Sequence, residues 1–217
     1  MKRFKVIACE VAFRELCSCA SQVHAIVDFT FMPRKLHIVG AEQMRETLQS
    51  EIDKVDVHKY QAIFLAYGLC GCGVVGLKSK LPIVIPKAHD CISIFLGSDQ
   101  RYVDIKQEYP KAFYFTSGWL EREMIPNSGR ISENFTLYKS MIDHIIFINT
   151  GVGNSEEYRK EVHEIAEKLE SSFTEIEGDK TLLFEFLNGD WKEDHFTIIP
   201  PKHSVIATND NNIIGYK

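Results

Sequence analysis

Short apolar runs alternate with amphipathic segments along most of this chain. The runs that we expect to form strands lie at residues 4–10, 24–33, 62–69, 82–86, 112–119, 144–150, 172–177 and 195–201. Some of them are apolar at nearly every position, which is the pattern of strands that are covered on both faces. The segments between them carry apolar residues at helical spacing, so the pattern predicts alternating strands and helices.

The clearest helical pattern lies at residues 41–55, where Met44, Leu48 and Ile52 recur every four positions with charged residues between them. A second strong pattern begins at Asn154 or Ser155, either of which could serve as its N-cap. Other helices are expected at residues 13–22, 91–109 and 181–190.

This alternation predicts an α/β fold with a mostly parallel sheet flanked by helices, or two Rossmann-like halves that share a cleft. The two-part alternative rests on comparable strand–helix units at roughly 1–70 and 142–200. We expect a single α/β domain over residues 1–217, with a soft boundary at 121–140, where the periodicity is weakest.

Composition and charge exclude several classes of function. The formal charge is −5 and the pI is near 5.9, and no tract combines basic residues with stacking aromatics, so nucleic-acid binding is not expected. No apolar run approaches the roughly 18 residues of a membrane span. Glu10 and Arg14 interrupt the N-terminal apolar run, which argues against a signal peptide. We therefore expect a cytoplasmic protein that has no membrane partner.

Cysteine and histidine follow three of the predicted strands. Cys9 ends the first strand, Cys70 follows the strand at 62–69, and His89 and Cys91 follow the strand at 82–86. In a reducing compartment such cysteines serve as free thiols, metal ligands or catalytic groups rather than as disulfides. Ligands of open α/β sheets bind outside the carboxyl ends of the strands, so we expect these side chains to share a site.

Cys9, Cys70, His89 and Cys91 together form a Cys3His donor set, which suits tetrahedral zinc or iron. An iron–sulfur cluster would also accept four soft ligands. Three bound ligands would leave a position for water or substrate, and Cys72 is a reserve ligand.

The same residues also support the hypothesis of an enzyme that uses no metal. Cys91 is a candidate nucleophile, because a thiol in the first turn of a helix has a lowered pKa, and His89 is a candidate acid or base.

Glycines at 68, 71 and 73 surround the cysteines of the loop after residue 66 and would let the backbone approach a ligand closely. Tyr67 and Trp119 border the same predicted crevice, and we include both with the three glycines as candidate ligand-binding residues. A tight turn and a buried tryptophan are the structural alternatives. The loop lacks the acidic partner of a dinucleotide fingerprint and the Lys-Ser/Thr ending of a P-loop.

Other cysteines and histidines carry no assigned role. Cys17 and Cys19 fall within the predicted helix at 13–22, and we interpret them as partly buried helix residues. Four other histidines have no sequence spacing that would bring them to one site. They are His144, His163, His195 and His203.

Several segments resemble one protein family. They are ACE at the first strand, YGLCGCGVVGL, IPKAHDCISIFLGS, SGWLERE, and LNGDW followed by IIPP. The chain resembles, over nearly its whole length, the family known as domain of unknown function 1638. By this resemblance Cys9, Cys70, His89 and Cys91 match motif positions, whereas Cys72 does not. Members look like proteins of anaerobes and methanogens that are encoded near corrinoid-dependent methyltransferases, which implies a role in methyl-transfer metabolism.

Three hypotheses of function follow. The first is a zinc- or iron-binding protein that serves corrinoid-dependent methyl transfer in an anaerobe, as an accessory protein or as a small-molecule enzyme. Its partner would be a small molecule or a corrinoid methyl-transfer protein. The second is a metal-free thiol enzyme that uses cysteine and histidine in acid–base or nucleophilic chemistry. The third is a carrier that delivers a metal or cofactor without turnover.

Overall fold

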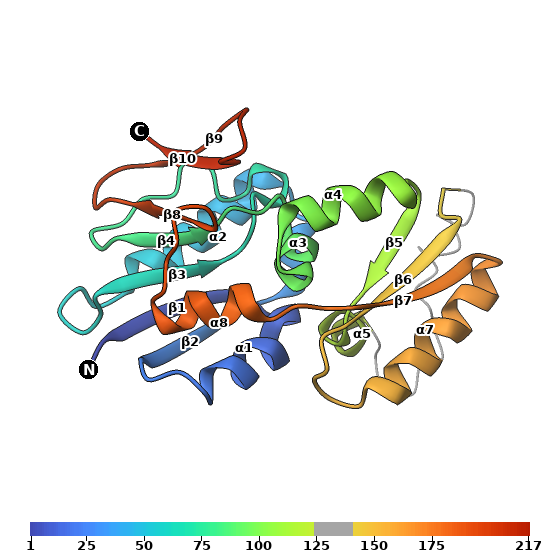
Figure 1. The fold of residues 1–217 in the computed structure, drawn as a ribbon. Coiled ribbons are helices and arrows are strands. Elements are labelled where there is room, and N and C mark those ends of the chain that lie inside the picture. Colours follow the sequence, from blue (N-terminus) through green and yellow to red (C-terminus); the bar gives the residue numbers. More distant parts are fainter. Residues whose placement is uncertain (124–140) are drawn as a thin grey trace.

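Two sheets organise the fold of this computed structural model, which describes residues 1–123 and 141–217 (Figure 1). The larger sheet has the strand order β2-β1-β3-β4-β8. Its strands are β1 (Arg3–Cys9), β2 (Ile26–Met32), β3 (Ala62–Ala66), β4 (Ile83–Pro86) and β8 (Phe196–Ile199). The first four run parallel to one another, and β8 pairs antiparallel with β4.

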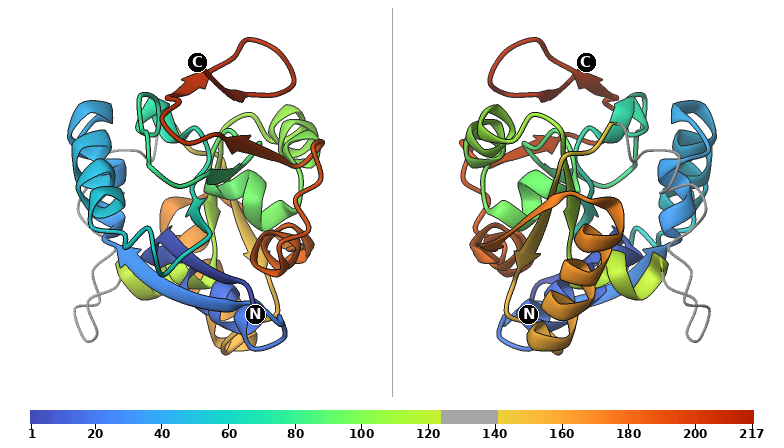
Figure 2. Two further views of the ribbon diagram at one scale, coloured as in Figure 1. Left: turned by 90° about the vertical axis from the view of Figure 1, so that its left-hand side faces the viewer. Right: turned by 90° about the vertical axis from the view of Figure 1, so that its right-hand side faces the viewer.

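Helices cover both faces of the larger sheet, as the apolar character of its central strands requires. Every residue of β3 and β4 is buried. Helix α2 (Ala41–Asp53) buries Met44, Leu48 and Ile52, whose spacing predicted it. Figure 2 shows α2 on one side of the sheet and α8 (Thr181–Asn188) on the other. Helix α1 (Phe13–Ala20) packs against α8.

The smaller sheet contains three parallel strands in the order β5-β6-β7. They are β5 (Ala112–Phe115), β6 (His144–Asn149) and β7 (Ser172–Glu177). Helix α7 (Ser155–Leu169) packs on β6 and β7 and shares a second apolar core with them. Asn154 caps α7 by accepting a hydrogen bond from the backbone N–H of Glu157, so the predicted start of this helix is confirmed.

Shorter elements connect the sheets and close the fold. Helices α3 (Cys91–Leu96), α4 (Asp99–Glu108) and α5 (Ser117–Glu123) lie between β4 and the residues that are not described. The described residues also form the 3-10 turns η1 (Glu10–Ala12), η2 (Arg34–His37) and η3 (Cys70–Cys72). A hairpin of β9 (Val205–Ala207) and β10 (Ile214–Tyr216) ends the chain.

The prediction of an α/β fold with a mostly parallel sheet flanked by helices is confirmed. The chain passes between the two sheets twice, between β4 and β5 and again between β7 and β8. Most of the segment predicted as a soft boundary, residues 124–140, lies outside the described residues. No helix of the described part is long and apolar enough to cross a membrane.

Some element predictions were wrong in detail. The helix predicted at 91–109 is two helices, because Gly97 ends α3 with a φ of +80° and Ser98 caps α4. The strand predicted at 112–119 stops at Phe115, and Trp119 lies on α5 instead. The final hairpin was not predicted.

Candidate functional site

Three cysteines from separate elements gather at one edge of the larger sheet. Cys9 is the last residue of β1, Cys70 lies in η3 after β3, and Cys91 is the first residue of α3 after β4. These strands are neighbours and parallel, so their carboxyl ends meet. After burial, the neighbouring Cys70 and Cys9 thiols contribute to the raised pKa of Cys91, as expected for groups at the same edge of the sheet. We call Cys9, Cys70 and Cys91 the thiol cluster.

The loop that carries Cys70 has an unusual backbone. Cys70 and Cys72 have φ angles of +45° and +70°, and Gly71 between them has +62°. Residues other than glycine rarely adopt this left-handed region, and each costs roughly 1 kcal/mol or more. The Cys70 N–H donates to the His89 carbonyl oxygen at 2.9 Å, which ties the loop to the chain after β4. The fold thus holds Cys70 in a costly conformation beside Cys91.

Two of the loop glycines lie where a side chain would meet other protein atoms. A Cβ at Gly68 would lie 2.7 Å from the Ala88 carbonyl oxygen, and one at Gly73 would lie 2.3 Å from Met44 Sδ. Gly71 has no neighbour within 4 Å of that position, so its positive φ alone explains its residue type. The ligand-binding roles predicted for these glycines stay predictions.

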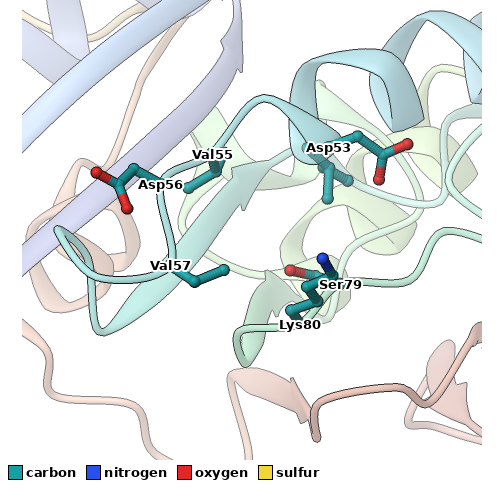
Figure 3. A pocket seen from close by; sticks show the side chains of 7 residues that line it. Asp53, Val55, Asp56, Val57, Ser79 and Lys80 are labelled. Atoms are coloured by element: carbon teal, nitrogen blue, oxygen red, sulfur yellow. The ribbon is translucent and has the colours of Figure 1, made fainter.

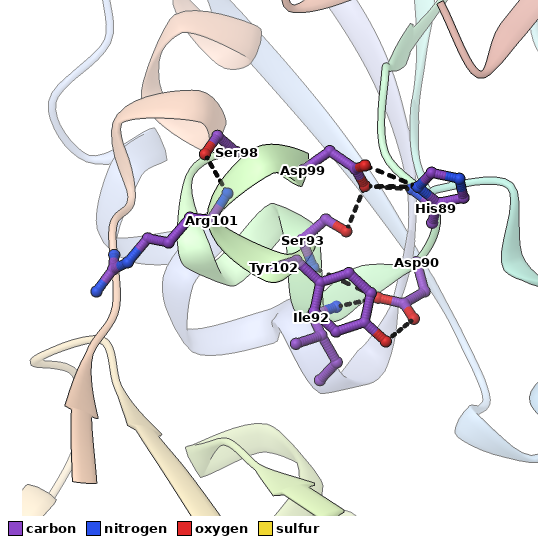
Figure 4. Close-up of polar contacts among 8 residues, drawn as sticks. All are labelled: His89, Asp90, Ile92, Ser93, Ser98, Asp99, Arg101 and Tyr102. Atoms are coloured by element: carbon purple, nitrogen blue, oxygen red, sulfur yellow. Dashed lines mark hydrogen bonds and ion pairs between the residues drawn. The ribbon is translucent and has the colours of Figure 1, made fainter. Parts of the chain in front are cut away.

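Asp90 fixes the position of Cys91. Its carboxylate caps α3 by accepting from the backbone N–H groups of Ile92 at 2.9 Å and Ser93 at 3.4 Å. The Tyr102 hydroxyl donates to the same carboxylate at 3.1 Å (Figure 4). The negative charge of Asp90 also raises the pKa of both Cys70 and Cys91.

Burial dominates the electrostatics of the thiol cluster. It raises the pKa of Cys9 to about 11 and that of Cys70 to about 12, and it raises the pKa of Cys91 well above its ordinary value. Cys70 and Cys91 keep some exposed surface, but protein atoms surround both sulfurs. The three thiols are therefore neutral at neutral pH unless a cation joins them.

His37 is a member of the site that the sequence reasoning missed. It lies in η2, beyond the carboxyl end of β2, and its Nε2 is 3.3 Å from Cys9 Sγ. Burial lowers the pKa of His37, so its imidazole is neutral. The cysteines were selected because they follow predicted strands. His37 also follows a strand, β2, but Pro33 and the turn η2 separate it from the strand end.

Two aromatic side chains with unpaired polar groups border the cluster. Tyr67 is 1% exposed, and its hydroxyl has no hydrogen-bond partner in the described part of the chain. Burial, followed by the nearby cysteines, raises its pKa. Among the same residues the Trp119 indole N–H also lacks a partner at normal distance, although it lies close enough to Cys91 to oppose the rise in that thiol's pKa. Buried donors without partners are rare, so these two groups are candidates for hydrogen bonds to a ligand.

His89 has a different environment from the thiol cluster. Its Nδ1 lies 2.8 Å from both carboxylate oxygens of Asp99, and Figure 4 shows its ring directed toward that residue. Its side chain is 54% exposed and lines a pocket of about 440 Å³ that none of the six cysteines lines. The prediction that His89 joins the cysteines stays a prediction.

Three cysteines lie away from the cluster or at its margin. Cys72 is exposed, Cys17 is partly buried, and Cys19 is buried with its Sγ 4.0 Å from the Lys180 carbonyl oxygen. Within residues 1–123 and 141–217, no three Cys, His, Asp or Glu side chains are already arranged to hold a metal ion. A metal in the thiol cluster would require the cysteine side chains to turn toward it.

Another pocket lies at the opposite edge of the larger sheet (Figure 3). Its volume is about 340 Å³, and it is lined by Ile52, Asp53, Val55, Asp56, Val57, Ser79 and Lys80. These residues precede β3 and β4, so the pocket is at the amino ends of the strands. It contains none of the predicted site residues, and the carboxyl edge remains the better candidate.

Comparison with known proteins identifies a family. The family model described as "Protein of unknown function (DUF1638)" matches residues 31–187, which is more than half of the chain. The match includes Cys70, His89 and Cys91, whereas Cys9 precedes it. No curated protein and no solved structure matches the chain. The chain therefore belongs to the DUF1638 family, as its motifs predicted.

Proposed function

We propose that this protein binds a zinc or iron ion through the thiol cluster. The observation that carries the proposal is the gathering of three largely buried cysteines, from the ends of three adjacent strands, beside a neutral imidazole. Thiolate and imidazole are the ligands that select zinc and iron in proteins. Cys9, Cys70 and Cys91 would bind through sulfur, and His37 Nε2 would supply the nitrogen.

The raised pKa values of the thiols also favour a metal over the metal-free enzyme. A neutral thiol is a weak nucleophile, and the neutral His37 provides no positive charge to stabilise a thiolate. A divalent ion would reverse this balance, because a coordinated thiol loses its proton even where burial disfavours the free thiolate. The unpaired donors of Tyr67 and Trp119 are available to hydrogen-bond a thiolate or a metal-bound ligand.

His37 replaces His89 as the preferred nitrogen ligand in this proposal. His37 already contacts Cys9. By contrast, the Nδ1 of His89 contacts Asp99, and both residues line a pocket that contains no cysteine. If His37 stays unbound, three thiolates leave a coordination position for water or a substrate. That position would distinguish an enzyme from a metal carrier.

We propose that the metal centre serves corrinoid-dependent methyl transfer, as the family resemblance implies, with the ion polarising a substrate thiol or water. The corrinoid protein partner stays a prediction on the same basis, and the cytoplasmic location stays a prediction from the interrupted N-terminal apolar run.

Elemental analysis of protein purified without oxygen tests the metal site. We expect near-stoichiometric zinc or iron in the parent protein and its loss in Cys70→Ser and Cys91→Ser. Cys17→Ser and Cys72→Ser are matched controls that should keep the metal, since these cysteines lie outside the cluster. His37→Ala should lower the metal affinity of the thiol cluster more than His89→Ala does.

Two results would contradict this proposal. One is a parent protein that stays free of metal after purification in zinc- or iron-supplemented medium. The other is full metal retention in both cluster variants. In either case, rapid alkylation of Cys91 at neutral pH would instead support the metal-free thiol enzyme.

A further inference from the structure

Two histidines outside the thiol cluster share one pocket, and each is oriented by a carboxylate. The pocket has a volume of about 440 Å³ and is lined by His89 and His195, among others. His89 Nδ1 contacts Asp99, and His195 Nδ1 lies 2.8 Å from Glu185 Oε2. Since the Nδ1 atom of each ring is engaged, each Nε2 is left as the atom that can bind a ligand.

The His89 ring is held by a network rather than by one contact. Asp99 is the first residue of α4, and its Oδ1 also accepts from the Ser93 hydroxyl at 2.9 Å and from the His89 backbone N–H at 3.1 Å (Figure 4). The Asp99 side chain is only 19% exposed, whereas that of His89 is 54% exposed. A largely buried carboxylate thus positions an accessible imidazole.

The His195 ring, which also lines the pocket, is held in a similar way by a carboxylate. Glu185 on α8 is largely buried, with a side chain 11% exposed, while the His195 side chain is 40% exposed. Lys192 also pairs with the Glu185 carboxylate. In the described residues no hydrogen bond involves the Nε2 of His89 or of His195.

The fold places these two histidines on adjacent chain segments. The Lys87 N–H donates to the His195 carbonyl oxygen at 2.8 Å, at the point where the β4–β8 pairing ends. Asp194 and Asp210 line the same pocket, and Lys87 Nζ donates to Asn212 Oδ1 at 2.7 Å. The aspartates of the lining outnumber its one lysine, which favours a cationic ligand.

We propose that this pocket is a second metal site, in which His89 and His195 bind a divalent transition-metal ion through Nε2. Imidazole suits zinc, nickel and copper, and a ligating histidine usually donates its other N–H to a carboxylate, as both rings do here. Two protein ligands leave the other coordination positions to water or to a small substrate that fits the pocket. None of the residues that line this pocket belongs to the thiol cluster.

Calorimetric titration of anaerobically purified protein with Zn²⁺ tests the second site. We expect a binding event in the parent protein that persists in Cys70→Ser and weakens at least about tenfold in His89→Ala and in His195→Ala. Asp99→Asn should weaken it roughly 10- to 100-fold while leaving both ligands present. His163→Ala is the control, since His163 is also 54% exposed and faces a carboxylate, that of Glu167, but does not line the pocket.

A direct readout on the parent protein removes any ambiguity from variants that fold poorly. In ¹⁵N-detected histidine spectra, Zn²⁺ should shift the Nε2 signals of His89 and His195 and leave those of His163 unchanged. Zn²⁺ that binds only at the cysteines, with no shift at His89 or His195, would overturn the second site without affecting the first. Loss of the binding event in Cys70→Ser, with retention in both histidine variants, would overturn it as well.

Discussion

At the scale of single residues, the site depends on close backbone approaches that only glycine permits. Gly118 lies in α5 directly before Trp119, and a Cβ there would be 1.7 Å from the Val11 carbonyl oxygen. Val11 belongs to η1, which follows Cys9. The absence of a side chain at Gly118 therefore brings α5, and with it the indole of Trp119, against the segment that carries the first cysteine.

Replacing Gly118 tests this role against a matched glycine. Gly118→Ala should destabilise the protein by about 3 kcal/mol, because the new methyl group meets rigid backbone. Gly73→Ala should cost about 1 kcal/mol or less, since its Cβ would meet the flexible Met44 side chain. Chemical denaturation measures both. Equal losses in the two variants would contradict the tight packing of α5 on η1.

At the scale of elements, a charged cluster joins three neighbouring segments at the amino edge of the larger sheet. Asp28 on β2 accepts hydrogen bonds from the Tyr60 hydroxyl at 2.8 Å and from Arg3 Nε on β1 at 3.0 Å, and it pairs with Lys59 at 3.2 Å. The Tyr60 hydroxyl, then Arg3 and Lys59, lower the pKa of Asp28 to about 2. This cluster lies at the opposite edge from the thiol cluster, so changes in it should affect stability rather than metal binding.

The lowered pKa of Asp28 predicts a pH dependence of stability. Because the folded-state pKa lies below the unfolded value of about 3.9, the cluster stabilises the fold above that value, and the contribution is lost as the pH falls toward 2. Asp28→Asn should remove about 1 kcal/mol at pH 7, a figure reduced for the solvent that reaches nearly a third of this side chain. The free energies of unfolding of the parent and of Asp28→Asn should become equal as the pH is lowered from 5 to 2. A constant difference would contradict the assignment.

At the scale of the whole molecule, a buried carboxyl group joins the two halves of the fold. Glu15 on α1 is fully buried, and its Oε1 accepts from the Ser117 hydroxyl at 3.0 Å and from the Thr150 hydroxyl at 2.7 Å. Ser117 and Thr150 follow β5 and β6 of the smaller sheet, whereas α1 follows β1 of the larger one. Its Oε2 has no partner among the described residues. Burial raises the pKa of Glu15, despite these hydrogen bonds.

Glu15 should make the stability of the whole protein fall as the pH rises. Its folded-state pKa is raised, so its contribution is greatest below the unfolded value of about 4.3 and is lost as the pH rises through the folded-state value. Glu15→Gln cannot ionise and should therefore gain stability relative to the parent between pH 5 and pH 8. Denaturant titrations of both proteins at these two pH values measure the gain. A difference that does not change with pH would contradict a raised pKa.

The sequence by itself determined several of the main helices and strands and the identity of the thiols. The period of the apolar residues predicted α2 and α7, and the apolar runs predicted β3, β4 and β6, because these patterns depend on neighbours along the chain. Cysteines directly after strands were selected for the same reason, and Cys9, Cys70 and Cys91 lie together at the sheet edge.

Only the tertiary structure decided which other groups join these cysteines. His37 is close to Cys9 because β2 pairs with β1, and His89 meets Asp99 because Gly97 and Ser98 turn the chain between two helices. The antiparallel pairing of β8, which brings His195 beside the chain after β4, is likewise a contact between distant segments. Strand order, pairing direction and side-chain direction arise from long-range packing, which no local pattern of residues encodes.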